Sequence, residues 1–365
     1  MDGDIILVIV VATALAFDFT NGFHDTANVV ATAISTRALP PKPAVAFAAI
    51  LNFVGAFISL KVAATVGTGI VAATEITMPI VFAGLVGAIA WNLATWYYGL
   101  PSSSSHALIG GLVGATLVAT GTHAIHGDGL LAKVIIPALI APILAFGVAG
   151  AAITVIYRIV GRVRPGPVTR GFKLGQLASG GLLALSHGTN DAQKTMGIIT
   201  LALVAHGNIS ADAFHVPDWV VLCSATAIAA GTYIGGWRII RTMGSRIIKM
   251  DAAQGFSAQS AGATVILAAS HFGYPLSTTH VINGGIMGAG AAKRLSAVRW
   301  GVAGNIVVAW VLTIPAAALG GALVYGVTRI FGTGATGPVV VSAAIVFATI
   351  ALLTRRARST AEAAA

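Results

Sequence analysis

Two short polar segments with matching residue types interrupt long apolar runs of this sequence. The first contains Asp25 and the second contains Asp191, each three residues after a glycine. An ionised carboxylate in an apolar membrane span costs at least about 2.5 kcal/mol, which a bound cation, a basic partner or a water-filled cavity normally offsets. Because two matching carboxylates are harder to explain as accidents than one, the pattern favours a site for a coupling cation or a proton. The other polar side chains of the two segments are Asn21, His24, Thr26, Asn28, His187, Thr189, Asn190, Gln193 and Lys194.

These polar neighbours suit both cations and anions. Hard cations bind oxygen ligands, which the amides and hydroxyls provide, whereas anions bind N–H and O–H donors. Lys194 follows Asp191 by one helical turn, so it either forms a structural ion pair with that carboxylate or contacts an anion. We expect the helices to break at Gly22 and Gly188, which would free backbone carbonyls and amides for a ligand. Further candidate contacts for a proton or an anion are His24 and Gln193.

Two clusters of hydroxyl side chains form a second matched pair. Residues 101–106 read Pro-Ser-Ser-Ser-Ser-His, residues 275–280 read Pro-Leu-Ser-Thr-Thr-His, and a pair of glycines follows each. Proline followed by serine or threonine is typical of a helix N-terminus, where free N–H groups, hydroxyls and the helix dipole attract anions. One such cluster alone would be interpreted as a helix cap. Two clusters matched in order predict a site for a tetrahedral oxyanion between facing helix ends, and leave His106 and His280 with either a structural or a functional role.

The composition indicates which elements must carry these segments. Charged residues make up 9% of the 365 residues and AVILMFWYC make up 56%, whereas a soluble domain has about 25% charged residues. So few charges cannot cover so much apolar surface in water, which excludes a soluble enzyme and a disordered chain. The apolar runs are continuous rather than alternating, which excludes a β-barrel and predicts an all-α polytopic membrane protein. We expect eleven spans, near residues 5–34, 43–66, 80–98, 104–122, 133–157, 174–204, 217–237, 252–270, 276–292, 300–328 and 338–354.

The charges in the connections predict the orientation. Basic residues concentrate in alternate connections, and acidic residues occupy the others. The positive-inside rule then places the N-terminus outside and the C-terminus in the cytoplasm. Topology therefore explains the formal net charge of +10, which does not indicate a nucleic-acid partner. The basic connections lie near residues 37–42, 158–173, 238–249, 293–299 and 355–358.

The matched segments recur in the same order and with nearly the same spacing, which indicates an internal repeat. Each repeat holds five spans, an odd number, so the second repeat crosses the membrane in the direction opposite to the first. We expect a first inverted repeat at residues 1–157, a basic cytoplasmic linker at 158–173, a second inverted repeat at 174–328 and an extra C-terminal transmembrane helix at 338–354. Broken or re-entrant helices at the midplane would carry the polar segments.

At these residues the sequence resembles the inorganic phosphate transporter family, commonly called PiT. The resemblance rests on Gly22-Phe-His-Asp-Thr-Ala-Asn28 and Ser186-His-Gly-Thr-Asn-Asp-Ala-Gln-Lys194, with support from segments 101–106 and 275–280 and from Gln254-Gly-Phe256. It covers essentially the whole chain. The resemblance implies secondary transport of inorganic phosphate, driven by sodium ions or protons, with the substrates bound between two inverted halves.

The resemblance also implies individual contacts. The sequence resembles bacterial members often described as proton-coupled carriers of neutral metal–phosphate, which favours protons as the coupling ion. Sodium coupling would instead place sodium at Asp25 and Asp191. The implied phosphate ligands are Ser103, Ser104, Ser105, Ser277, Thr278, Thr279 and Asn190. The implied cation-coupling core is Asp25, Asn28 and Asp191, to which the local composition adds Asn21 and Thr26.

We therefore predict a secondary active transporter of the plasma (inner) membrane that imports inorganic phosphate by cation symport through alternating access. The expected partners are inorganic phosphate, the lipid bilayer and the co-transported cation, a proton, sodium or a divalent metal travelling with phosphate; a homodimer is compatible with the sequence. No cofactor is expected, and the sequence offers no nucleophile–base pair or catalytic metal set typical of an enzyme. Two alternatives remain: a symporter of sulfate or another tetrahedral oxyanion, and an ion channel or non-transporting sensor.

Overall fold

The computed structural model describes residues 2–332 and 334–362, and these residues are helical apart from short connections. The side chains of the basic residues at 355–358 lie outside the described part. The helices are α1 (Asp2–Ser35), α2 (Pro41–Gly55), α3 (Lys61–Thr68), α4 (Met78–Tyr98), α5 (Ser104–Thr120), α6 (Gly127–Leu130), α7 (Ile136–Val160), α8 (Pro165–His206), α9 (Asp218–Ile234), α10 (Trp237–Arg241), α11 (Ala252–His271), α12 (Thr278–Lys293), α13 (Trp300–Ile330) and α14 (Thr336–Glu362).

Proline and glycine set several of these helix boundaries. α2, α4 and α8 each have proline at one of their first two positions, where its missing N–H has no intrahelical partner to lose. α4 and α8 end at Gly99 and Gly207, which have φ angles of 67° and 88°. This left-handed conformation is open to glycine, so both helices stop where the sequence supplies one.

The eleven predicted spans all coincide with helices, which confirms the all-α polytopic class. Individually, four described helical segments are long and apolar enough to cross a bilayer, or five if the bent pair 218–234 and 237–246 counts as one span. The two segments of that pair meet at 59°. The remaining predicted spans are shorter, more polar or interrupted; residues 43–66, for example, divide into α2 and α3 at the connection 56–60.

The predicted helix breaks at Gly22 and Gly188 are wrong, because α1 and α8 run without interruption through both glycines. The glycines instead permit close helix contacts. A Cβ on Gly22 would meet the backbone of α9 at Ile228 and Gly231, and a Cβ on Gly188 would meet the backbone of α2 at Asn52. The missing side chains let α1 lie against α9 and α8 against α2, so the polar segments are carried on long continuous helices.

The interruptions occur instead before α5 and α12. Both helices are short, and each begins within a hydroxyl cluster, after an extended stretch that contains a proline. The first turns of α5 and α12 meet, since the rings of His106 and His280 lie edge to face with centroids 4.7 Å apart. The structure therefore has two half-length helices whose N-terminal ends converge.

Packing around these two helices follows one scheme. α5 packs along α4 and α13, and α12 packs along α11 and α7. The glycines after each hydroxyl cluster form the contacts: Cβ atoms on Gly110 and Gly114 would meet the backbone of α13, and Cβ atoms on Gly284 and Gly288 would meet the backbone of α7. Each half-length helix is thus held by one helix from its own half of the sequence and by the last long helix of the other half.

The apolar core is divided into two large clusters by the polar segments. In α1 one cluster ends at Phe17 and the other starts at Ala27, and in α8 the division falls between Ala184 and Ala192. The carboxylates therefore lie between two apolar layers.

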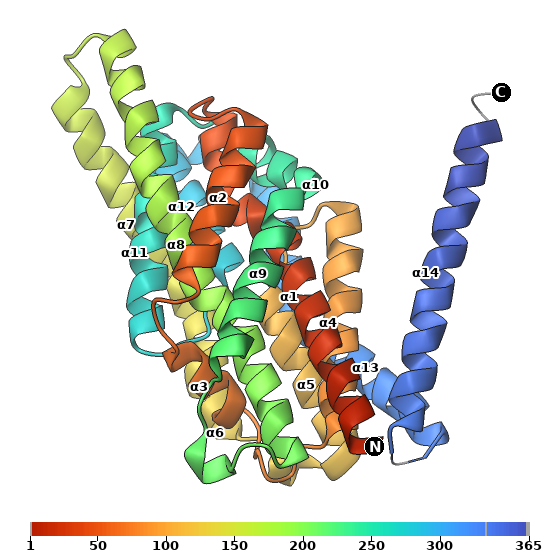
Figure 1. Ribbon diagram of the computed structural model, residues 1–365. Coiled ribbons are helices and arrows are strands. Elements are labelled where there is room, and N and C mark those ends of the chain that lie inside the picture. The colour runs from red at the N-terminus through yellow and green to blue at the C-terminus, as the bar shows by residue number, and fades with distance from the viewer. Residues whose placement is uncertain (1, 333, 363–365) are drawn as a thin grey trace.

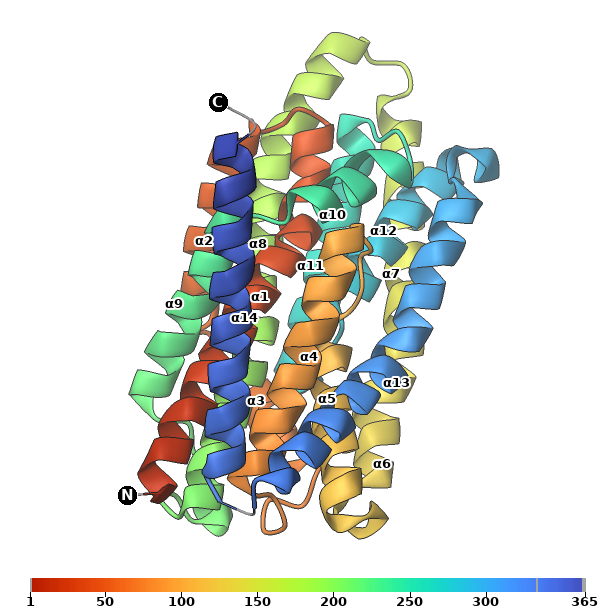
Figure 2. The same ribbon diagram turned by 90° about the vertical axis from the view of Figure 1, so that its right-hand side faces the viewer.

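The two ends of the bundle carry different connections. In Figure 1 the start of α1 lies at the lower end, while the α7–α8 connection and the C-terminal end of α14 lie at the upper end. Figure 2 shows that the connection from α12 to α13 and the short helix α10 also lie toward the upper end, so the basic connections share one side. α14 stands beside the bundle and touches α13, α1 and α4.

Candidate functional site

Asp25, His187 and Asp191 meet where α1 crosses α8, and we call them the carboxylate cluster. The three residues are 2%, 0% and 0% exposed. One ligand atom from each lies within 4.8 Å of the other two. Nε2 of His187 lies 3.0 Å from Oδ2 of Asp191, outside hydrogen-bonding geometry. Oxygen ligands lie about 2.3–2.6 Å from a hard cation such as Ca²⁺, so the three atoms are close enough to share one ion.

Lys194 brings a positive charge to the edge of this cluster. Its ammonium contacts Oδ1 of Asp191 and donates hydrogen bonds to Oγ of Ser105 at 2.5 Å and to the carbonyl of Leu276 at 2.8 Å. These three acceptors use all three N–H donors of the ammonium. Lys194 is buried, with 1% of the residue exposed. Lys194 therefore forms the ion pair with Asp191 and also joins α8 to α5 and to the extended stretch before α12.

Two threonines at the start of α12 link the carboxylates to the helix end. The hydroxyl of Thr278 donates to Oδ2 of Asp191 at 3.0 Å, and that of Thr279 donates to Oδ1 of Asp25 at 3.4 Å. Nδ2 of Asn28 donates to both hydroxyl oxygens, at 3.2 and 2.8 Å. Each threonine hydroxyl thus has its one proton directed at a carboxylate and its oxygen occupied by an amide.

The serines of the hydroxyl clusters divide into caps and inward-facing groups. Oγ of Ser103 accepts from the N–H of His106 at 3.1 Å, and Oγ of Ser277 accepts from the N–H of His280 at 3.2 Å, so both cap their helices. Ser105 instead donates to the carbonyl of Leu276 at 3.1 Å, beside the ammonium of Lys194. Oγ of Ser104 lies 3.5 Å from Nδ1 of His24, which itself lies 2.6 Å from Oδ1 of Asp25.

Two of the predicted contacts make their hydrogen bonds away from the carboxylate cluster. Nδ2 of Asn190 donates to Oγ of Ser270 at 2.8 Å and to the carbonyl of Tyr274 at 3.1 Å. Oε1 of Gln193 accepts from two backbone N–H groups in the first turn of α3, at 2.8 and 3.2 Å. Gln193 thereby caps α3 from the neighbouring helix, and the ligand roles of both residues stay predictions.

Thr26 and Asn21 also lie beside the cluster rather than in it. The hydroxyl of Thr26 donates to the carbonyl of Gly22 at 2.7 Å and lies 3.2 Å from the carbonyl of Thr232 on α9. Asn21 is 1% exposed, and its Oδ1 has no hydrogen-bond partner among the described residues. The cation contacts assigned to both residues likewise stay predictions.

The sequence profile of the phosphate transporter family matches residues 21–321, which is most of the chain and includes both polar segments and both hydroxyl clusters. The chain belongs to the phosphate transporter family. Members of this family are transporters, so the prediction that the chain is not an enzyme is confirmed, as is the resemblance found in the sequence. Together with its apolar helices, the family makes this chain a multi-pass membrane protein.

Individual relatives agree over nearly the full length. The chain is 53% identical over 327 residues to a probable low-affinity inorganic phosphate transporter of Mycobacterium tuberculosis, covering 90% of this chain and 78% of the relative. It is 51% identical to a protein of the same description from Rhizobium meliloti, covering 88% and 96% of the two chains. The solved structure titled "The sodium-dependent phosphate transporter" has the same fold, with a TM-score of 0.82, 24% identity and coverage of 89% and 99%.

Some buried polar residues of this transporter-family member were not expected at the site. Nδ2 of Asn52 on α2 donates to Oγ1 of Thr232 on α9 at 2.8 Å, and Oδ1 of Asn52 lies 3.2 Å from Nδ1 of His187. Oγ1 of Thr95 on α4 lies 3.1 Å from Nε2 of His24. Asn52 is the only amide side chain in the predicted span 43–66, and Lys61 is the only charged residue of that span. A lone amide in an apolar run is the signal that could have identified it.

The histidines that close the hydroxyl clusters pack against aromatic rings. The ring of His280 stacks on Trp310 of α13 with centroids 4.0 Å apart, and its other neighbour is the ring of His106. Both histidines are buried, at 4% and 2% exposed. Of the two roles that the sequence left open, these contacts favour the structural one.

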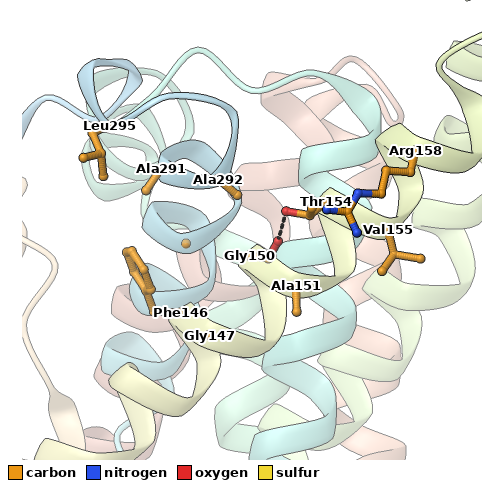
Figure 3. A pocket seen from close by; sticks show the side chains of 11 residues that line it. Phe146, Gly147, Gly150, Ala151, Thr154, Val155, Arg158, Ala291, Ala292 and Leu295 are labelled. Carbon is orange, nitrogen blue, oxygen red and sulfur yellow. Dashed lines mark hydrogen bonds between the residues drawn. The ribbon is translucent and has the colours of Figure 1, made fainter.

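A surface cavity of about 510 Å³ lies away from this site, between α7 and α12. Figure 3 shows that its labelled lining combines glycines and alanines of both helices with the larger side chains of Phe146, Val155, Arg158 and Leu295. The hydroxyl of Thr154 bonds back to the carbonyl of Gly150. None of the residues that line it belongs to the carboxylate cluster or the hydroxyl clusters. The hollow reflects the small side chains that let the two helices approach each other.

Proposed function

We propose that this protein imports inorganic phosphate across the plasma membrane by cation symport, with the anion bound where α5 and α12 converge and a cation bound at the carboxylate cluster. We further propose that the N-terminus lies outside and the C-terminus in the cytoplasm. The phosphate part follows the family and its relatives, and the coupling to a cation follows from the chemistry of the buried residues.

The observation that carries the coupling is the pair of threonines at the start of α12. Their hydroxyl protons point at Asp191 and Asp25. A cation at the carboxylate cluster would satisfy those oxygens, and the hydroxyls would then be free to rotate toward an anion. Because a hydroxyl has one proton, it cannot serve the carboxylate and the phosphate together. Cation binding therefore prepares the anion site, which is the physical basis of symport in this proposal.

The anion itself would be held by helix ends and by Lys194. The first turns of α5 and α12 offer free N–H groups and the positive ends of two helix dipoles. The ammonium of Lys194 lies between them, in contact with Ser105 and the carbonyl of Leu276. A bare phosphate dianion is expensive to move into a low dielectric, so a bound cation and the ammonium both lower that cost.

Alternating access would use the two inverted repeats, 1–157 and 174–328, as the moving units. The packing scheme supports this division, since the contacts of α5 with α4 and α13 correspond to those of α12 with α11 and α7. α7 packs on α12 and α13 packs on α5, so the last helix of each repeat contacts the half-length helix of the other repeat. Movement of one repeat against the other would shift both helix ends at the same time.

The experiment is phosphate uptake into proteoliposomes, with a sodium gradient and a pH gradient imposed separately. We expect uphill accumulation with at least one gradient, and the effective gradient identifies the coupling ion. If excess sulfate inhibited the uptake of labelled phosphate as strongly as excess unlabelled phosphate does, the substrate would be reassigned to oxyanions in general. Uptake that neither saturates nor responds to either gradient would reject symport in favour of a channel.

A further inference from the structure

A basic cavity lies away from the carboxylate cluster, where α10 meets the end of α4. Its volume is about 320 Å³, at the lower end of the range for small-ligand sites. Figure 2 shows α10 beside the upper end of α4, at the end of the bundle that carries the basic connections. We call this cavity the arginine pocket. The arginines and aromatic residues of its lining are Tyr98, Trp237, Arg238, Arg241 and Arg246.

A bend in the chain forms one wall of the arginine pocket. The segments 218–234 and 237–246 meet at 59°. Gly235 lies at the bend with a φ angle of 77°, a conformation that is open to glycine. Beyond the bend, Arg238 and Arg241 are three residues apart in α10, which puts them on the same face of the helix. The bend therefore places the arginines beside the end of α4.

Contacts with α4 hold this wall in position. The guanidinium of Arg238 donates to the carbonyl of Tyr97, and its Cζ lies 4.8 Å from the ring centre of Tyr97 and 5.5 Å from that of Trp96. The hydroxyl of Thr242 donates to the carbonyl of Gly99 at 2.8 Å. Two hydrogen bonds and two ring contacts thus join residues 238–242 to the end of α4, so the pocket has a fixed frame.

The positive charge of the arginine pocket has no acidic counterpart. No carboxylate in the described part of the chain forms an ion pair with any of its three arginines. Arg241 and Arg246 are exposed. Guanidinium groups stay charged at all physiological pH values, so three of them around one cavity repel one another unless an anion lies between them. A phosphate group suits this place, because its oxygens accept paired N–H bonds from a guanidinium.

The surroundings indicate which phosphate compound reaches the pocket. α4 is long and apolar enough to cross a bilayer, and it ends at Tyr98. Tyr98 is 73% exposed and Trp237 is 46% exposed. Exposed tyrosine and tryptophan at the ends of spans are typical of the level of the lipid headgroups. Basic pockets between transmembrane helices are also known places for the headgroups of anionic lipids.

We infer that the arginine pocket binds a phosphate group, and that an anionic phospholipid of the leaflet that borders the basic connections carries this group. Arg241 and Arg246 contact the phosphate, and Arg238 sets the position of the wall. The rings of Tyr98 and Trp237 lie against the glycerol and the acyl chains. No residue of the carboxylate cluster or the hydroxyl clusters lines the pocket, so the inference does not depend on the proposed transport activity.

The test is native mass spectrometry of the purified full-length protein in detergent, titrated with dioctanoyl phosphatidylglycerol or dioctanoyl phosphatidylcholine. We expect the wild type to bind one phosphatidylglycerol at least about tenfold more tightly than phosphatidylcholine. The double variant Arg241→Gln with Arg246→Gln should lose most of this preference. Arg162→Gln with Arg164→Gln is the matched control, since both residues are exposed at the same end of the bundle and do not line the pocket.

A second arm of the test measures binding of labelled inorganic phosphate by equilibrium dialysis. If the double variant bound one phosphate ion fewer than the wild type but kept its preference for phosphatidylglycerol, a free phosphate would be the ligand and the inference would fail. Equal binding of the two lipids by the wild type, or the same preference in the double variant and its control, would also overturn it. If circular dichroism shows that the double variant has not folded, Arg241→Gln alone provides the reading.

Discussion

Lys194 is the residue on which the most contacts of the site converge. It pairs with Asp191, and its ammonium also bonds to Ser105 and to the carbonyl of Leu276. A buried ion pair is expensive to break from one side, because the remaining charge is left without compensation. The same pair holds the ends of α5 and α12 together, so its loss affects both stability and binding.

Replacement of Lys194 by methionine should therefore destabilise the protein by about 3–5 kcal/mol and abolish phosphate uptake. The double variant Lys194→Met with Asp191→Asn should recover part of the stability but none of the uptake, since no uncompensated charge then remains. Unfolding of the purified protein, followed by tryptophan fluorescence, measures the first effect. Lys42→Met is the control, because Lys42 is exposed and should change stability by less than about 0.5 kcal/mol. A stable and active Lys194→Met protein would contradict this role.

The sequence predicted the important residue types but not their partners. Asp25, Asp191 and Lys194 could be identified because charge is so rare in this chain. That Thr278 and Thr279 bond to the carboxylates, whereas Ser103 and Ser277 cap helices, depends on the register in which α12 docks against α1 and α8. Such a register is set by tertiary packing, which the local pattern does not contain.

At the scale of elements, the half-length helices depend on glycine contacts with their long neighbours. Cβ atoms on Gly284 and Gly288 would meet backbone atoms of Pro142 and Phe146 on α7. The sequence correctly indicated helix ends at the hydroxyl clusters, but it placed further breaks at Gly22 and Gly188. A glycine in an apolar run has the same local pattern whether it breaks a helix or permits a close crossing, so only the partner helix decides.

Gly288→Ala should push α12 away from α7 and displace the threonines at its start. Overpacking of this kind costs about 1–3 kcal/mol, and we expect phosphate uptake to fall several-fold. Gly147→Ala on α7 is the matched control, since a Cβ there meets no atom within 4 Å and should leave stability unchanged or slightly higher. Thermal unfolding and uptake of both variants provide the comparison, and equal behaviour of the two would count against a packing role for Gly288.

At the scale of the whole molecule, the basic and acidic connections lie at opposite ends of the bundle, as Figure 1 and Figure 2 show. The number and nature of the apolar segments, and the all-α class, could be predicted from the composition together with the continuous apolar runs along the chain. The exchange of α7 and α13 between the two halves could not, because it rests on contacts between residues more than a hundred positions apart.

Orientation gives a prediction at this scale. In a Cys223→Ser background, the variant Asp212→Cys should react with a membrane-impermeant maleimide in intact cells. The variant Thr169→Cys, in the basic segment 158–173, should react only in inverted vesicles. Both positions are exposed, so a difference in labelling reports sidedness rather than burial. The reverse pattern would invert the proposed topology.

The central claim is that a cation at the carboxylate cluster makes phosphate binding and transport favourable. The most direct measurement is gradient-driven phosphate uptake by proteoliposomes that contain the wild type, Asp25→Asn, Asp191→Asn or the control Asp212→Asn, whose side chain is exposed. We predict uphill uptake by the wild type and the control, and a loss of at least about tenfold in each buried variant, equivalent to about 1.4 kcal/mol or more. Undiminished gradient-driven uptake in both Asp25→Asn and Asp191→Asn would contradict the account.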